Sequence, residues 1–452
     1  MLLQLIDRDE DLALAARAVP RAPAAEVTAD TMSGPWIWLL CCLSFCGVTV
    51  NQAVGTLAIV LFLAPWTLII IPRLKEFAGM VARDWSLFCL PALGLFSVLW
   101  STNRYISLRY STEYVITVFV GIAAARLVER RTLLTSMMIG VAAVVFAGIL
   151  HDVYKGTIHL SLSAKAAEEG FFNSKNQLGS YSTVIFLLSF YFMIFNKKSM
   201  MLRIVSAGIF FPSIVSIVLA KSGGVYVSIF ITFVLSVTLL FYKRNKFLSI
   251  VFFLMSTLLA LVFLVYGGGA SGVFSGALSI LGKDSTLTGR TDLWALALDV
   301  IGDYPVTGIG YHAFWVVGNP LAEAMWAKFQ ISGRTGFHFH DTYLEIGVEL
   351  GLTGLLLVLI LVLRSMFRAG MVFVEGKNWV NVPLSMIMFY YGFLSSVEVE
   401  FVNEFILSTV ILCICSSRVP PKRESAVGVG KFLSTGQPDK RLEADRLAGT
   451  YA

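Results

Sequence analysis

Long apolar runs fill most of this sequence, and they restrict the chain to few folds. The runs reach about 15 to 20 residues, close to the length at which a helix rising 1.5 Å per residue crosses about 30 Å of hydrocarbon. Of the 452 residues, 57% are hydrophobic and 14% are charged, and the mean hydropathy is +0.77. Soluble globular domains of this length do not show such a composition. The sequence predicts an all-α, polytopic integral membrane protein.

Twelve transmembrane spans are predicted along the chain. Their approximate limits are 34–50, 53–71, 85–100, 112–126, 132–150, 179–195, 204–220, 225–242, 247–266, 342–363, 382–397 and 403–416. The pattern divides the chain into an N-terminal tail (1–33), a transmembrane domain (34–416) and a C-terminal tail (417–452). A large loop at 267–349 separates the ninth span from the tenth. A loop of that length is usually functional or has structure of its own.

Lysine and arginine residues indicate the orientation, because they stay preferentially on the cytoplasmic side of membrane loops. With the N-terminus inside, 25 of the 35 Lys and Arg residues fall on the cytoplasmic side. Both termini are therefore expected in the cytoplasm, with the loop at 267–349 on the outer face. This bias accounts for most of the net charge of +6, so the charge does not require a nucleic-acid partner. The expected partner of the apolar spans is the lipid bilayer.

Several cations collect on the predicted outer face. Arg109 falls in a short outer loop at 101–111, Lys175 and Asn176 precede the sixth span, and Lys221 ends the seventh span. Each of these side chains alone is typical of an interfacial anchor. Together with a cation in the large loop, they predict an electropositive mouth that binds an anion.

That further cation is Arg290, at the start of a predicted amphipathic helix at 288–305. A positive side chain in the first helical turn opposes the helix dipole, which favours acidic groups. Exposed N–H groups, the positive helix end and a guanidinium would together bind phosphate or pyrophosphate. The alternative is a simple ion pair of Arg290 with Asp292 or Asp284.

The stretch "FHFHDTYLEIGVELGLTG" (337–354) places two histidines where the tenth span begins on the outer side. His340 is expected to accept a proton from a hydroxyl near neutral pH, with Asp341, Glu345 or Glu349 orienting the imidazole. The alternative is that these polar residues only mark the start of the helix and form no chemical site. A metal site at His338 and His340 is a weak hypothesis, because no third ligand is evident in the sequence.

The spacing of these residues is similar to a known signature. His340 and Asp341, then nine residues, then the glycine-rich turn from Gly351 to Gly354 resemble the O-antigen ligase and polymerase superfamily. The segments "GRTDLW", "YPVTGIGYHAF", "FFNSKNQLGSY" and "LWSTNRYISLRYS" are similar to other landmarks of the family, and the resemblance covers roughly residues 85 to 410. The chain departs from the family pattern at "AKSGGVY", just after the seventh span. Many family members have an arginine there, whereas this chain has glycine, and Lys221 is the residue that could replace the arginine.

The resemblance implies a GT-C-like membrane glycosyltransferase that uses neither a cofactor nor a metal ion. The donor would be an oligosaccharide on undecaprenyl pyrophosphate, transferred to a glycan acceptor on the periplasmic face of a bacterial inner membrane. His340 and Asp341 would be catalytic, with Arg290, Lys221, Arg109 and Lys175 binding the pyrophosphate. Asn176, Glu349, Gly351 and Gly354 would support the site. A chain-length regulator or export proteins are the further partners implied.

Three functions are compatible with these features. The segments at 99–111 and 171–179 look more like the exopolysaccharide polymerase branch, which favours a polymerase. The alternative within the family is a ligase that passes the glycan to lipid A core. A lipid or glycan transporter is the third reading, and the nearly charge-free spans argue against it.

Overall fold

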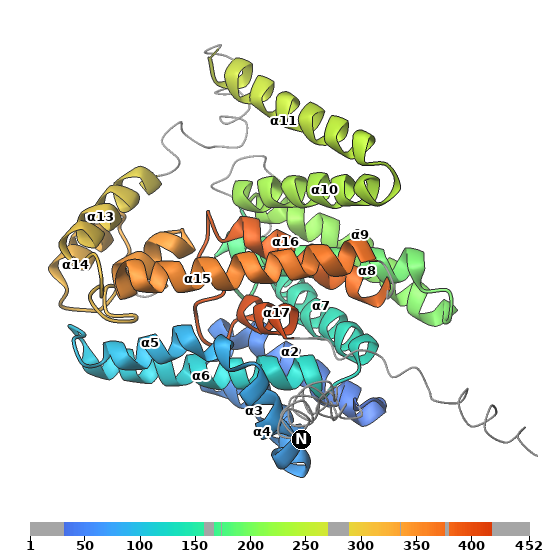
Figure 1. Cartoon of the computed structure of the whole chain (residues 1–452), viewed down its shortest axis with the longest axis horizontal. Helices are drawn as coiled ribbons and strands as arrows, with labels where there is room; N and C mark the ends of the chain where they lie inside the picture. The colour runs from blue at the N-terminus through green and yellow to red at the C-terminus, as the bar shows by residue number, and fades with distance from the viewer. Residues whose placement is uncertain are drawn as a thin grey trace, which may run out of the picture. The chain divides into compact units, whose positions relative to one another are not determined.

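The computed structural model describes residues 31–157, 167–172, 174–269, 289–334, 336–375 and 379–417. Figure 1 shows helices throughout these residues, and the β-structure among them is one isolated bridge, between Met32 and Val128. The all-α class predicted from the sequence is therefore confirmed for the described residues. Almost all of the two predicted tails lies outside them, and so do residues 270–288 of the predicted outer loop, which include Asp284.

The helices of the described residues follow one another with connections that range from one residue to more than a dozen. Their bounds are α2 (Pro35–Val54), α3 (Thr56–Ile70), α4 (Leu74–Arg83), α5 (Cys89–Ser97), α6 (Arg104–Arg126), α7 (Arg130–Lys155), α8 (Lys175–Phe195), α9 (Met200–Ala220), α10 (Gly223–Arg244), α11 (Lys246–Gly269), α13 (Arg290–Asp303), α14 (Pro320–Lys328), α15 (Thr342–Glu375), α16 (Val382–Leu394) and α17 (Leu407–Ser416).

Six of the described helical segments are long and apolar enough to cross a membrane. They are Thr56–Arg83, Arg130–Lys155, Lys175–Phe195, Met200–Ala220, Gly223–Arg244 and Thr342–Glu375. Several shorter apolar helices, α16 and α17 among them, accompany these six. The chain is thus a multi-pass membrane protein, while the number of twelve spans stays a prediction.

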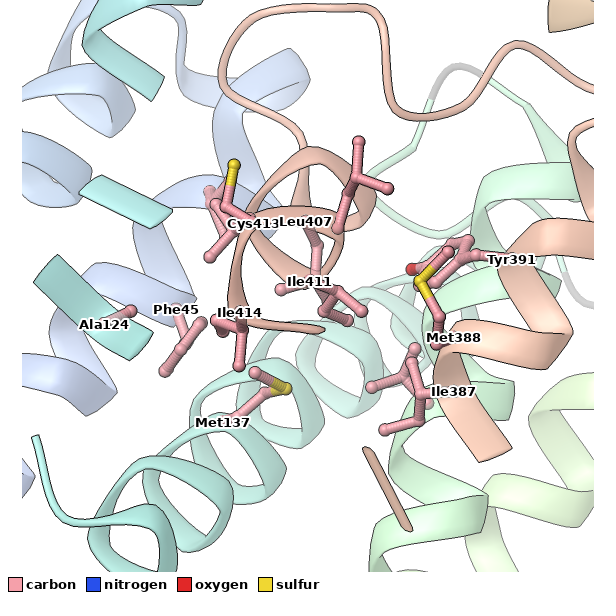
Figure 2. Packing of buried hydrophobic residues seen from close by; sticks show 14 of the residues in the cluster. Phe45, Ala124, Met137, Ile387, Met388, Tyr391, Leu407, Ile411, Cys413 and Ile414 are labelled. Carbon is pink, nitrogen blue, oxygen red and sulfur yellow. The ribbon is translucent and has the colours of Figure 1, made fainter. Parts of the chain in front are cut away.

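The short helix α17 lies in the centre of a hydrophobic core. Figure 2 shows its side chains between Phe45 of α2, Ala124 of α6, Met137 of α7 and Ile387 of α16. Ten helical residues rise only about 15 Å, half of a hydrocarbon layer. The predicted span 403–416 is therefore too long, since its first four residues are not helical. Non-helical backbone is tolerated at such depth where protein surrounds it or where it lines a cavity.

Two predicted loop segments are helical instead. The outer loop expected at 101–111 is mostly the first two turns of α6, which begins at Arg104. Asn103 starts this helix by accepting a hydrogen bond from the Ile106 N–H at 3.2 Å. The last residues of the loop expected at 267–349 also lie in a helix, because α15 begins at Thr342, the residue at which the tenth span is predicted to start. Polar and charged side chains at the starts of these two helices account for the loop limits drawn from the sequence.

Close packing joins α15 to α13 and to the chain that follows α13. A Cβ on Gly347 would lie 2.7 Å from a side-chain carbon of Ile301. Gly351 has φ of 64° and breaks the helical geometry of α15, and a Cβ there would lie 2.5 Å from the carbonyl of Val306. Gly347 and Gly351 therefore permit the close approach of α13 and its C-terminal extension to α15.

Candidate active site

A cavity of about 610 Å³ lies between the N-terminal halves of α6 and α8, the start of α15 and two irregular segments. One of these segments, 312–317, follows α13, and the other, 398–406, connects α16 to α17. The volume is in the range of pockets that bind small molecules and cofactors. Asn176, His338 and Glu398 line one part of this cavity, and His312 and Glu404 line another.

Glu398 gathers side chains from three distant parts of the chain. Its Oε1 accepts hydrogen bonds from Arg290 Nη2 at 2.8 Å and from Asn176 Nδ2 at 2.5 Å. Its Oε2 lies 3.3 Å from His340 Nδ1 and 3.9 Å from His338 Nε2. These five residues are called the Glu398 cluster below. Arg290 and His340 contact the carboxylate without lining the cavity themselves, and both side chains are partly exposed.

Thr342 fixes the position of Glu398 relative to α15. Its hydroxyl donates to the Glu398 carbonyl at 2.9 Å and accepts the Glu400 N–H at 2.8 Å. The Thr342 N–H also donates to the Ser395 carbonyl at 2.9 Å. Three bonds from one buried residue therefore hold the irregular segment after α16 against the first turn of α15, where the histidines lie.

The backbone around His340 is locked in an unusual conformation. His340 has φ of 54°, a region that non-glycine residues rarely adopt, and the next helix begins two residues later. The preceding N–H, of Phe339, donates to the buried Glu345 side chain at 2.8 Å. The His340 N–H donates to His338 Nδ1 at 3.1 Å. Strain held in this way is typical of functional sites.

These hydrogen bonds also separate the roles of the two histidines. Because His338 Nδ1 accepts a backbone N–H, the proton of the neutral ring stays on Nε2, and this ring has no free acceptor nitrogen. His340 Nδ1 faces a carboxylate, which favours the proton on Nδ1 and leaves Nε2 free to accept another. The geometry thus agrees with the sequence prediction in favouring His340 over His338 as a proton acceptor.

The charges of the cluster are balanced around an ionised carboxylate. Burial alone would raise the pKa of Glu398, but the His340 hydrogen bond and the nearby His340, His338 and Arg290 lower it below its ordinary value. Burial, and next the neighbouring His340, lower the pKa of His338 to about 3. At neutral pH the carboxylate is therefore negative and His338 is neutral.

Most of the predicted anion-binding residues lie near this cluster. Arg290 and Asn176 contact Glu398 directly, and Asn176 also accepts a hydrogen bond from Ser222 at 2.7 Å. Lys175 and Lys221 lie within electrostatic range of one another, and Lys175 is also within range of Arg290 and Glu398. The simple pair of Arg290 with Asp292 is not formed, since Asp292 pairs with Lys328 at 2.7 Å.

The other predicted residues take different places. Asp341 caps α15, and its Oδ1 accepts the N–H groups of residues 343 and 344 at 2.8 and 2.9 Å. Arg109 pairs with Glu113 at 3.1 Å on α6, and its side chain is half exposed. Glu349 lines the cavity from within α15. Gly351 and Gly354 shape the α15 backbone, where a Cβ at Gly354 would lie 2.4 Å from Leu350.

Sequence reasoning missed Glu398. Its partners lie 58, 108 and 222 positions away, so no local pattern joins them. One signal was available, because Glu398, Glu400 and Glu404 fall within seven residues of an otherwise apolar region. Acidic residues at membrane depth are costly and mark functional positions.

Glu398 also completes a set of possible metal ligands. His338, His340 and Glu398 offer one ligand atom each, and these atoms lie within 4.8 Å of one another. Arg290 and Asn176 already bind Oε1 of the same carboxylate, and a guanidinium at 2.8 Å repels a cation. The absence of a metal from the reaction therefore stays a prediction from the sequence.

Comparisons with known proteins agree with the resemblance drawn from the sequence. A family model described as O-antigen ligase matches residues 208–359, which include Arg290 and His340 but not Glu398. The exopolysaccharide production protein ExoQ of Rhizobium meliloti is 28% identical over 384 residues. That alignment covers 82% of this chain and 86% of the relative.

Proposed function

We propose that this chain, a member of the O-antigen ligase family, polymerises glycan that is linked to undecaprenyl pyrophosphate. One observation carries the proposal: the Glu398 cluster joins a proton acceptor, His340, to a guanidinium, Arg290, through a single carboxylate. A base and an anion-binding group are the two elements that transfer from a pyrophosphate donor to a hydroxyl needs.

The acceptor hydroxyl attacks the anomeric carbon of the donor sugar in this proposal. As the new C–O bond forms, the bond from that carbon to the pyrophosphate oxygen breaks, and the hydroxyl proton passes to His340 Nε2. Glu398 holds the Nδ1 proton and stabilises the imidazolium that results. The undecaprenyl pyrophosphate leaves with the electron pair, so both atoms and charge balance without a cofactor or a metal ion.

Arg290 stabilises the negative charge that develops on the leaving pyrophosphate. The ion pair with Glu398 uses one Nη2 contact, and a guanidinium has five N–H donors. The remaining donors suit a bidentate contact with phosphate oxygens. Lys175 and Lys221 add positive charge close by. Stabilisation of this kind is often the largest single contribution to catalysis.

The polymerase reading rests on the similarity to an exopolysaccharide production protein along most of the chain. The description of the matching family model favours the alternative, a ligase that passes the glycan to lipid A core. Glycan length in a deletion strain tests the choice. Single repeats accumulating on the carrier lipid support a polymerase, whereas full-length chains stranded on the carrier support the ligase.

The site assignment is tested with two substitutions in the intact protein. His340→Ala and Arg290→Ala should each abolish polymer in a complemented deletion strain, at an unchanged protein level in the membrane. Asp292→Asn is the matched control, because this residue lies two positions from Arg290 but pairs with Lys328. Normal polymer from His340→Ala would remove the proposed mechanism.

The proposal places the protein in a bacterial inner membrane, with both termini cytoplasmic and the Glu398 cluster on the periplasmic side. The positive-inside bias and the family resemblance support this orientation. The donor, the acceptor glycan and the bilayer are the immediate partners. Proteins that regulate chain length or export the polymer would act on the product.

A further inference from the structure

The part of the cavity away from Glu398 has its own set of side chains, called the His312 end below: Tyr110, His312, Asn403 and Glu404. The rings of Tyr110 and His312 stack with centroids 4.6 Å apart and an interplanar angle of 19°. Glu404 Oε2 lies 3.7 Å from His312 Nε2. The mechanism proposed above uses none of these four residues.

The His312 end is held rigidly in place. His312 has φ of 53° and follows Tyr311, whose N–H donates to Ser97 Oγ at 3.0 Å and whose carbonyl accepts from Ser107 Oγ at 2.6 Å. Gly310 packs so closely that a Cβ would lie 2.3 Å from Ser101 Oγ. The ring of His312 is thus positioned before any ligand arrives, which lowers the entropy cost of binding.

A polar group at this end lacks a hydrogen-bond partner. Glu404 Oε2 is a buried acceptor without one among the described residues, and Glu404 lines the cavity. A buried polar atom left unpaired costs about 1–3 kcal/mol. Such atoms beside an aromatic stack are what a ligand rich in hydroxyl groups would satisfy.

The two ends of the cavity differ in charge. Burial raises the pKa of Glu404 to about 8 and lowers the pKa of His312 to about 4, so burial disfavours a charge on both side chains. Arg109 acts on Glu404 at a distance, but it is already paired with Glu113. Lys175, in contrast, lies within electrostatic range of Glu398, Arg290 and Lys221, so positive charge gathers near the Glu398 end although none of these three cations lines the cavity. A diphosphate suits the cationic end and an uncharged sugar suits the neutral end.

We propose that the His312 end binds a sugar of the acceptor glycan, with the ring against the Tyr110–His312 stack and its hydroxyls bonded to Glu404 and Asn403. An apolar ring face and polar edges are the features that an aromatic platform flanked by carboxyl and amide groups recognises. The inference rests on the proposed transfer reaction and adds where its second substrate lies. The cavity would then hold the donor at one end and the acceptor at the other.

The test uses the full-length purified protein and the oligosaccharide repeat released by mild acid from the lipid-linked intermediate. Binding of the fluorescently labelled repeat is measured directly, and elongation is measured with the released repeat and the lipid-linked donor varied separately. Tyr110→Ala and Glu404→Ala should each weaken binding of the released repeat by about tenfold or more. Both should raise its KM by a similar factor and leave the donor KM within about twofold of wild type.

Two control variants keep the result interpretable. Tyr105→Ala removes the same side chain from the same helix at a position that is 71% exposed, and it should bind like wild type. Tyr110→Phe keeps the ring and should retain binding, which separates loss of the stack from loss of the fold. Unchanged binding in both Tyr110→Ala and Glu404→Ala would overturn the inference, as would displacement of the repeat by inorganic pyrophosphate.

The outcomes also distinguish this inference from the proposed function. Elongation that depends on His340 but not on Tyr110 or Glu404 would refute the proposed acceptor site and would still support the proposed transferase activity. Binding of the repeat that depends on Tyr110, in a protein that never elongates glycan, would support the sugar site and refute the proposed transferase activity.

Discussion

Replacing Glu398 with glutamine tests the Glu398 cluster most sharply. Glutamine keeps the shape and can still accept from Arg290 and Asn176 through one oxygen, 2.8 and 2.5 Å away in the wild type. The other oxygen becomes an NH₂ donor that faces His340 Nδ1. His340 must then accept through Nδ1 and carry its proton on Nε2, which removes the proton acceptor from the reaction.

The expected loss is that of a general base in the wrong tautomer. Such a base contributes about 10²–10⁴-fold, and the equivalent substitution in the serine protease triad falls at the upper end of that range. Glu398→Gln should therefore lower kcat for elongation by about 10²–10⁴, which is about 2.7–5.4 kcal/mol of activation free energy. The donor KM should stay within about threefold of wild type, because Arg290 keeps one acceptor.

The assay follows elongation of lipid-linked repeats by purified protein, with thermal unfolding as the check on folding. Asp299→Asn is the matched control, since it also removes one carboxylate but from an exposed position on α13. A Glu398→Gln protein that unfolds at the wild-type temperature and elongates within about threefold of the wild-type rate would refute the role given to Glu398.

Three further predictions concern stability and metals. Gly351→Ala should lower the free energy of unfolding by more than about 2 kcal/mol, because φ of 64° and the Val306 carbonyl leave no room for a Cβ, and thermal unfolding in detergent measures this. Burial raises the pKa of Glu404 from 4.5 to about 8, so the folded state keeps a proton that the unfolded chain loses. Stability should thus fall as pH rises from about 4.5 to about 8, and Glu404→Gln should reduce that slope. EDTA should leave elongation unchanged, and added Zn²⁺ should not increase it; loss of activity with EDTA, restored by Zn²⁺, would instead make the Glu398 cluster a metal centre.

Two comparisons control these stability measurements. Gly208→Ala places a Cβ in open space on α9 and should stabilise the protein by up to about 1 kcal/mol, the opposite sign to Gly351→Ala. For Glu404→Gln, a pH dependence identical to that of wild type would show that this carboxyl does not retain its proton on folding.

Local patterns predicted the helices well because apolar runs have few alternatives in a membrane. They failed where polar residues continue a helix beyond its apolar part, as in the turns of α6 that begin at Arg104. They failed again at α17, because an apolar run does not reveal that its first residues line a cavity instead of forming a helix. Hydropathy measures transfer of a residue to lipid. It does not tell whether a segment at membrane depth is surrounded by protein, where the backbone need not be helical.

For the site, sequence identified residues whose local surroundings are unusual. Arg290 opposes a helix dipole and His340 precedes a membrane helix, so each stands out within a few positions. Glu398 stands out only as one of three glutamates in an apolar region, because its role comes from contacts with Asn176 and Arg290, both more than 100 positions away. Asp341 shows the converse limit: its spacing fits a catalytic signature, while its Oδ1 caps α15.

The central claim is best tested by supplying purified protein in liposomes with lipid-linked single repeats and separating the products by size. The account predicts a ladder of longer glycans together with released undecaprenyl pyrophosphate from the wild type, and neither product from His340→Ala. Movement of the lipid-linked repeat across the bilayer without any lengthening of glycan would contradict the account and favour a transporter.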